Sequence, residues 1–206
     1  GVFFDEAIHP NGAKLFQARI IPFRGSWLDF TTDINDCLFT IIDRRRKFPV
    51  TMLLRALGFS TNRDIFRAFD CITTISLKSK DIDKYYGTTI INDIIDENTG
   101  EIFFEGGTKV DVSVVETLVN NKISQVEVVD SDRQFSSMLL LNTMEKDPTH
   151  STEEALGVVY QLIRSGEPPN LETAQKFIER QFFSPKKYDL GQVGRYRLNQ
   201  QFDLDV

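Results

Sequence analysis

Three strand-like segments near the start of the chain lead into a concentrated positive charge. Residues 16–22, 27–33 and 37–43 are rich in β-branched and aromatic residues and are separated by turn residues, which predicts three strands. The basic run at residues 44–47 follows the third segment directly. Pro49 then supplies the fixed φ that suits the first turn of a helix. The sequence therefore predicts a cationic cluster where a sheet passes into a helix.

Helical and strand-like patterns alternate along the rest of the chain. Ser151 and Glu154 form a capping box, in which Ser151 can accept from a first-turn amide while Glu154 reaches back. Asn170 is expected to cap another helix, and residues 188–199 form a polar, partly basic segment. Residues 88–130 predict two strands joined by a turn, then a helix and a third strand. The predicted fold class is α+β: a mixed helical and β body with an inserted small β–β–α–β module.

Charge is distributed unevenly along the chain. The formal net charge of −6 argues against nucleic-acid binding when the chain is taken as a whole. Between residues 81 and 154, however, 16 acidic residues stand against five basic ones, which leaves 19 basic and 14 acidic residues elsewhere. Such an asymmetry marks a compositional boundary. We therefore predict a basic body formed by residues 1–77 and 148–206 and an acidic inserted module at residues 78–147.

Several kinds of site find no support in the sequence. The apolar runs are too short for a membrane span, and no signal peptide opens the chain. Cys37 and Cys71 are isolated, so we expect buried, reduced thiols. The close acidic clusters lie in the acidic stretch or at the capping box, and His9 and His150 fit no catalytic triad. We therefore predict no catalytic residue and no metal site in this chain.

Six motifs occur in an order that is specific to one family. They are Arg-Ile-Ile-Pro-Phe-Arg-Gly-Ser-Trp-Leu-Asp-Phe (19–30), Ile-Asp-Arg-Arg-Arg-Lys-Phe-Pro (42–49), Leu-Leu-Arg-Ala-Leu-Gly (53–58), Arg-Ser-Gly-Glu-Pro-Pro (164–169), Phe-Phe-Ser-Pro-Lys-Lys-Tyr-Asp-Leu (182–190) and Val-Gly-Arg-Tyr-Arg-Leu-Asn (193–199). Together they resemble the lobe, or second domain, of the β subunit of bacterial DNA-dependent RNA polymerase. The resemblance covers about residues 1–75 and 148–202 and is weaker between them.

The resemblance implies a fragment of a much larger subunit that forms a wall of the DNA cleft and contacts downstream DNA and the non-template strand. The parent enzyme would be a nucleotidyltransferase that makes RNA. Its catalytic aspartates and its Mg²⁺ would belong to another subunit, β′, so this fragment is expected to hold no cofactor. The implied partners are DNA, the β′, α, ω and σ subunits, and transcription factors on the insertion, with no membrane. The implied location is the cytoplasm, in association with the nucleoid.

The resemblance also implies a pocket for an unpaired base of the non-template strand. The matching residues, together with the adjacent basic run, are Trp27, Asp43, Arg44, Arg45, Arg46, Asp189 and Arg195. The chemistry fits, because a carboxylate can accept from a guanine edge, an indole can stack on a base and arginines can pair with phosphates. A further arginine of that pocket would lie just before Gly1, so the site in this chain is expected to be incomplete.

These residues also have a purely structural interpretation. The arginines fit a solvated strand end, because charged side chains are mostly exposed. Trp27 fits a core position, and Asp43 fits a local salt-bridge partner or a turn residue. A second functional hypothesis is a protein-interaction module that docks σ or elongation factors through the acidic insertion, with DNA contact incidental. The two functions can be separated, because phosphate contacts weaken steeply with salt.

Overall fold

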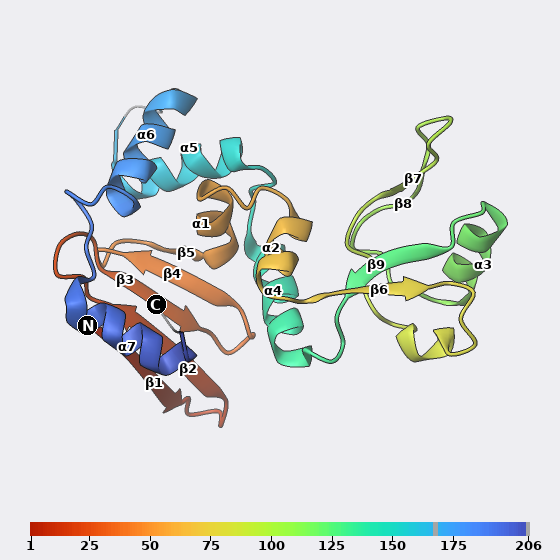
Figure 1. The fold of residues 1–206 in the computed structure, drawn as a ribbon, viewed down its shortest axis with the longest axis horizontal. Helices are drawn as coiled ribbons and strands as arrows, with labels where there is room; N and C mark the ends of the chain where they lie inside the picture. The colour runs from red at the N-terminus through yellow and green to blue at the C-terminus, as the bar shows by residue number, and fades with distance from the viewer. Residues whose placement is uncertain (167–168, 205–206) are drawn as a thin grey trace. The chain divides into compact units, whose positions relative to one another are not determined.

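The computed structural model describes residues 1–166 and 169–204. The chain forms two compact units, each with its own sheet and its own core (Figure 1). The body comprises Gly1–Thr61 and Leu139–Val206, and the module comprises Asn62–Met138. Among the described helices, none is long and apolar enough to cross a membrane.

A five-stranded antiparallel sheet runs through the body, with its strands paired in chain order. The strands are β1 (Val2–Ile8), β2 (Lys14–Ile20), β3 (Leu28–Thr32), β4 (Leu38–Ile42) and β5 (Lys47–Pro49). The three predicted strands are confirmed as β2, β3 and β4, with ends shifted by one or two residues. The sequence pattern does not reveal β1, because almost all of its side chains are exposed and its pairing with β2 rests on backbone hydrogen bonds.

Four helices of the body lie wholly in the described part of that unit. They are α1 (Val50–Ala56), α5 (Thr152–Ile163), α6 (Leu171–Phe182) and α7 (Gly191–Phe202). The predicted caps are confirmed: the Ser151 hydroxyl accepts from Glu154 N–H, and the Asn170 side chain accepts from Thr173 N–H. The Glu154 carboxylate reaches back to His150 N–H at 2.8 Å. Helix α7 replaces the polar segment expected at residues 188–199, which has no clear apolar stripe in sequence.

One apolar core joins the sheet to α1, α5 and α6. Buried side chains from all four elements form it: Leu28, Ile42, Phe48, Met52, Leu53, Ala56, Ala155, Leu156, Val159, Ile163, Ala174 and Ile178. Helix α7 lies against β1, where the rings of Phe4 and Phe202 meet edge to face with centroids 5.9 Å apart. The core therefore connects the first part of the chain with residues more than a hundred positions later, which makes the two segments of the body one unit.

The module is built on a smaller antiparallel pair of strands. Its elements are α2 (Asn62–Ala68), β6 (Ile72–Ser76), η1 (Ile82–Tyr85), β7 (Ile94–Ile95), β8 (Ile102–Phe104), α3 (Val112–Asn120) and β9 (Gln125–Val129). Strand β6 pairs with β9, and β7 pairs with β8 as a separate hairpin. Asp111 caps α3 as predicted, accepting from Val114 N–H at 2.8 Å. Ile75, Ile90, Leu118 and Val128 belong to a separate core, so the module buries apolar surface of its own.

The compact module starts and ends earlier than the predicted boundaries of 78–147. Strand β6 belongs to the module because it pairs with β9. Helix α4 (Gln134–Lys146) crosses the boundary, and its second half belongs to the body, where Thr143 is fully buried and its hydroxyl accepts from Leu38 N–H at 2.8 Å. With these bounds the body holds 16 acidic and 16 basic residues. The module holds 14 acidic and eight basic residues. The body is therefore balanced in charge, and its positive charge is a local feature.

A buried ion pair joins α1 to the segment that directly follows α4. Arg55 Nε lies 3.3 Å from Asp147 Oδ2, and the two side chains are 2% and 0% exposed. The Thr51 hydroxyl donates to Asp147 Oδ2 at 2.7 Å. The N–H and hydroxyl of Thr149 donate to Oδ1 at 2.8 and 2.6 Å, and Arg55 Nη1 donates to Ser60 O at 2.7 Å. Such pairs stabilise a fold only when their remaining hydrogen-bonding capacity is also met, and here both carboxylate oxygens are used.

Candidate nucleic-acid interface

The turn between β4 and β5 carries the predicted basic run. Arg45 N–H donates to Ile42 O at 3.0 Å, and the two central residues, Asp43 and Arg44, have φ of 50° and 57°. Positive φ at both positions is the type I′ arrangement, which matches strand twist and normally selects Asn, Asp or Gly. Asp43 suits its position, whereas an arginine with this backbone costs about 1–2 kcal/mol. Other contacts must therefore hold the turn in this conformation.

Contacts with Trp27 hold the turn. Asp43 Oδ1 accepts from Trp27 N–H at 2.8 Å, and Asp43 N–H donates to Trp27 O at 3.0 Å. The guanidinium carbon of Arg44 lies 4.7 Å from the centroid of the Trp27 ring, a cation–π contact worth about 0.5–1 kcal/mol at an exposed site. Asp43 is thus a turn residue whose carboxylate positions Trp27. Its second oxygen, Oδ2, has no hydrogen-bond partner among the described residues.

Trp27 is half-buried, so it lies at the rim of the body and not in its core. The core position considered for it is therefore wrong. Arg44, Arg45 and Arg46 are all exposed, in the turn and the residues that follow it. Because Arg44 lies over one face of the indole, a base that stacks on Trp27 must use the opposite face or displace the guanidinium.

Asp189 and Arg195 form a second group at the start of α7. Asp189 pairs with Arg24 through two backbone hydrogen bonds of 3.1 and 2.8 Å. Its Oδ1 accepts from Gly191 N–H at 2.9 Å and lies 3.8 Å from Arg195 Nη2. Gly191 has φ of 71°, and a Cβ there would lie 3.2 Å from the Cβ of Phe23. This contact and the positive φ both favour glycine at the first residue of the helix.

A short stretch of chain links the two groups. Arg24 pairs with Asp189 and precedes Trp27 by three residues, so the backbones of Trp27 and Asp189 lie within about 16 Å of each other. No hydrogen bond or ion pair joins the groups within the described residues. Asp43 lines one hollow and Asp189 and Arg195 line another. A single pocket shared by all of these residues stays a prediction.

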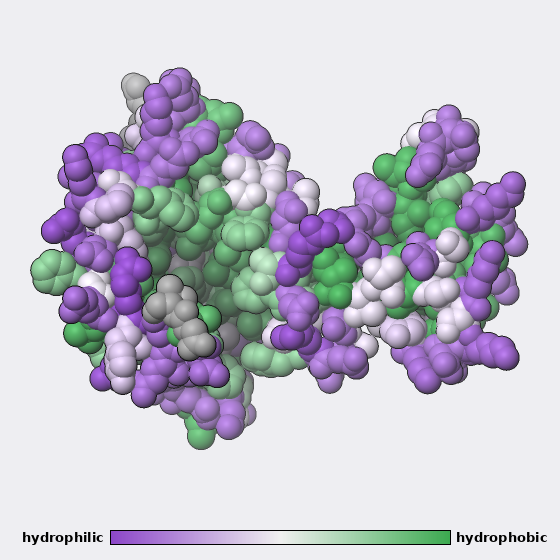
Figure 2. Space-filling view, viewed as in Figure 1, coloured by the Kyte–Doolittle hydropathy of each residue, from purple (hydrophilic) through white to green (hydrophobic). Residues whose placement is uncertain are grey.

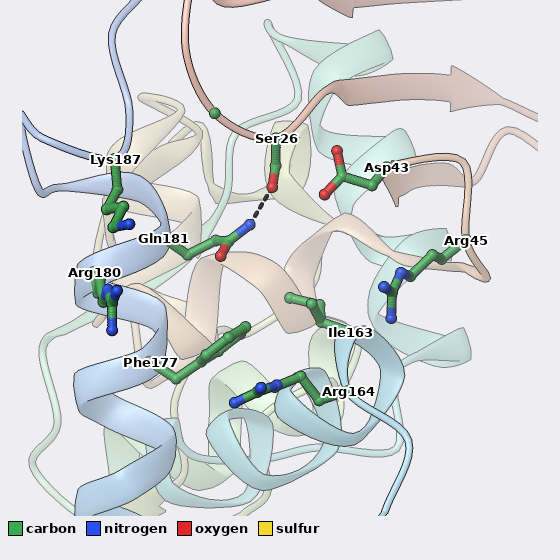
Figure 3. Close-up of a pocket in the computed structure, with 10 residues that line it drawn as sticks. Ser26, Asp43, Arg45, Ile163, Arg164, Phe177, Arg180, Gln181 and Lys187 are labelled. Carbon is green, nitrogen blue, oxygen red and sulfur yellow. Dashed lines mark hydrogen bonds between the residues drawn. The ribbon is translucent and has the colours of Figure 1, made fainter.

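A hollow beside the β4–β5 turn gathers basic residues that the predicted site does not include. Arg164, Arg180 and Lys187 line it together with Arg45 (Figure 3). Arg164 follows α5, Arg180 lies on α6, and Lys187 lies in the segment after α6. Two of them fall in the quoted motifs at residues 164–169 and 182–190, but their convergence on Arg45 depends on how α5 and α6 pack against the sheet. Figure 2 shows hydrophilic residues over the visible surface of α6.

Possible metal ligands and thiols in the described part of the chain form no second candidate site. In the described part of the chain, no three His, Cys, Asp or Glu side chains are grouped so that they could hold a metal ion. Cys37 and Cys71 are free and buried, as predicted. Burial is the main cause that raises the pKa of the Cys37 thiol above its ordinary value, which favours the protonated form.

The strained turn gives a prediction with matched variants. We expect Arg44→Gly to leave the free energy of unfolding within about 1 kcal/mol of the original, because relief of backbone strain offsets the lost cation–π contact and the added chain entropy. Arg44→Val should destabilise the body by roughly 1–2 kcal/mol more than Arg44→Gly, since a β-branched residue is strained at positive φ. Arg46→Val serves as the control, because Arg46 is not at positive φ. Urea unfolding measures all three, and equal effects of Gly and Val at position 44 would contradict the turn assignment.

Comparison with known proteins gives one consistent result. The family model described as RNA polymerase Rpb2, domain 2, matches residues 1–92 and 115–206. A relative named DNA-directed RNA polymerase subunit beta from Flavobacterium johnsoniae is 40% identical over 223 aligned residues, which cover 100% of this chain and 18% of the relative. Proteins of the same name from Chlorobium chlorochromatii and Porphyromonas gingivalis are 40% and 38% identical over 98% and 100% of this chain. The chain spans less than a fifth of the length of these relatives.

Proposed function

The chain belongs to the RNA polymerase Rpb2 domain 2 family, as a lobe segment of a bacterial β subunit, and we propose that it guides DNA during transcription. In this role it forms a wall of the DNA cleft. It contacts downstream DNA and the non-template strand through Trp27, Asp43, the three arginines that follow, Asp189 and Arg195. RNA synthesis by the whole enzyme, a nucleotidyltransferase, takes place elsewhere, on catalytic carboxylates and Mg²⁺ held by another subunit.

One observation carries this proposal: a half-buried indole is held at the rim of the body by a turn that also presents three exposed arginines. An aromatic ring beside cations is the combination used to bind single strands, because bases stack on the ring while phosphates meet the cations. Asp43 Oδ2, which has no hydrogen-bond partner among the described residues, adds an acceptor that suits the amino edge of a guanine. The strained backbone of Arg44 fits a functional site, where such strain is often found.

The location and the partners of the chain follow from the same proposal. As a polymerase segment it would lie in the cytoplasm with the nucleoid, beside the β′, α, ω and σ subunits and the DNA. The extent of a lineage-specific insertion stays a prediction. The family model matches residues on both sides of 93–114 and leaves that stretch unmatched.

A second candidate function is docking of σ or elongation factors on the module, and the β7–β8 hairpin favours it. Residues 93–105 carry five acidic residues and no basic one. Ile95 and Ile102 are each 47% exposed on this hairpin. Exposed apolar side chains set among like charges suit a partner that presents apolar and basic groups.

Two changes in the complete polymerase separate these functions. Trp27→Ala should shorten the lifetime of the open promoter complex roughly tenfold, because stacking on an aromatic side chain is worth about 1–3 kcal/mol per base. Trp27→Phe should restore much of it, since a stacking ring remains. Removal of residues 93–105 joins Asn92 to Gly106, which already lie close together, and should leave the lifetime unchanged. A polymerase that tolerates Trp27→Ala but loses open-complex lifetime with the hairpin would contradict the DNA-guiding role and favour docking.

A further inference from the structure

The basic hollow beside the β4–β5 turn is built from four separate parts of the body. Its lining consists of Gly25, Ser26, Asp43, Arg45, Ile163, Arg164, Phe177, Arg180, Gln181 and Lys187. The open space measures about 510 Å³. Figure 3 shows Arg180 and Lys187 on one side of this space, Arg45 on the other, and Arg164 next to Phe177. Side chains far apart in the sequence thus face a common volume.

The charges that line the basic hollow are not balanced. Within the described residues, four cations, Arg45, Arg164, Arg180 and Lys187, face one carboxylate, that of Asp43. One oxygen of this carboxylate is already held by Trp27 N–H. Among the described residues, no carboxylate forms an ion pair with any of the four cations. Like charges that share a small space repel one another, so a bound anion would stabilise the arrangement.

Neutral groups complete the surroundings of such an anion. Gln181 Nε2 donates to Ser26 Oγ, so the serine hydroxyl keeps its own hydrogen for another acceptor (Figure 3). Ser26 is 6% exposed and lines the hollow. Phe177 lines the floor, where the Arg164 guanidinium lies 5.6 Å from the ring centroid. This stacking helps to hold the Arg164 guanidinium group in a fixed orientation.

We propose that the basic hollow binds the terminal phosphate group of a nucleotide. Arginine forks pair with phosphate oxygens through two parallel hydrogen bonds, and lysine adds a point charge. A terminal phosphate carries about −1.5 to −2 charges at neutral pH, which would offset much of the surplus of positive charge in the hollow. The volume exceeds that of one phosphate, and the apolar floor of Ile163 and Phe177 can receive the attached group. This site goes beyond the proposed DNA surface, with which it shares Asp43 and Arg45.

Calorimetric titration of the 206-residue chain tests this site at constant ionic strength. The probes are inorganic phosphate, adenosine monophosphate, adenosine, and a ten-nucleotide DNA strand without a terminal phosphate. We expect saturable binding of phosphate and of the monophosphate, and none of adenosine. The DNA strand, which has no terminal phosphate, should not displace the monophosphate at equal concentration; displacement would show that the hollow is part of the DNA surface and would overturn the nucleotide site. Absence of saturable phosphate and monophosphate binding, or equal binding of adenosine and its monophosphate, would overturn the proposal.

Matched variants locate the binding in the basic hollow. Each of Arg164→Gln, Arg180→Gln and Lys187→Gln should weaken monophosphate binding about tenfold, because a hydrogen bond between charged groups is lost. Lys186→Gln removes the same charge from the neighbouring exposed residue, which does not line the hollow, and should have little effect. Equal weakening by Lys186→Gln and Lys187→Gln would show a general charge effect and overturn the site. Trp27→Ala should leave monophosphate binding intact, so failure of this site and failure of the DNA-guiding role give different results.

Discussion

Replacement of Asp147 by alanine is expected to lower the free energy of unfolding of the body by about 3–5 kcal/mol. The substitution removes the carboxylate that pairs with the buried guanidinium of Arg55 on α1. It also removes the acceptor for the hydroxyls of Thr51 and Thr149. Loss of a carboxylate that pairs with a buried guanidinium and accepts from buried hydroxyls is among the few causes of such large effects. The loss of stability should appear in the unfolding of the body, because all of these groups lie in that unit.

Chemical denaturation, followed with a probe in the body, measures this loss. Glu145→Ala is the matched control, because Glu145 is an exposed carboxylate two residues earlier in α4. The control should change the free energy of unfolding by no more than about 0.5 kcal/mol. Asp147→Asn, which keeps the shape and one acceptor oxygen, should fall between the two. If Asp147→Ala and Glu145→Ala proved equally mild, the ion pair would have no central place in the stability of the body.

The combined variant Arg44→Ala, Arg45→Ala and Arg46→Ala is expected to shorten the lifetime of the open complex of the complete polymerase and to reduce its dependence on salt. Each phosphate contact that is lost should lower the slope of log affinity against log salt by about one. The three side chains are exposed, so the stability of the chain should change by about 0.5 kcal/mol or less for Arg45 and Arg46, and by up to about 1 kcal/mol for Arg44, which loses its contact with Trp27. The effect on DNA should therefore greatly exceed the effect on folding.

Thermal melting of the chain and open-complex lifetime against salt are the two measurements that check this expectation. A control variant with Lys146, Lys176 and Arg197 replaced by alanine removes the same charge from exposed residues of the body outside the candidate surface. This control variant should keep the original dependence of open-complex lifetime on salt. If melting collapsed in the arginine variant while the lifetime per active molecule stayed the same, the arginines would be structural.

Local patterns in the sequence are enough to predict much of the body. Alternating β-branched residues predict β2, β3 and β4, and hydrogen-bonding side chains predict the starts of α5 and α6, because both signals act over a few residues. Helix α7 is missed, since the pattern at residues 188–199 has no pronounced apolar face. The module boundary is also missed at α4, because only tertiary packing shows that Thr143 and Asp147 are buried in the body.

The candidate site is predictable only in part for the same reason. The family motifs identify Trp27, Asp43 and the arginine run, and the structure brings Trp27, Asp43 and Arg44 into contact. The positive φ of Asp43 and Arg44 is not visible in the sequence, because neither residue is a glycine. The basic hollow depends on the packing of α5 and α6 against the sheet, which no local pattern specifies.

The fluorescence emission of Trp27 gives the most direct test of the DNA-guiding role. This chain contains one tryptophan, so tryptophan emission reports on that residue. A single-stranded oligonucleotide is added to the chain at low salt, and its binding is followed separately by the anisotropy of a dye on the DNA. We predict that emission is quenched in step with binding, that rising salt reverses both signals, and that the triple arginine variant shows neither at the same DNA concentration. DNA that binds with unchanged Trp27 emission would contradict the account, because its bases would then lie elsewhere.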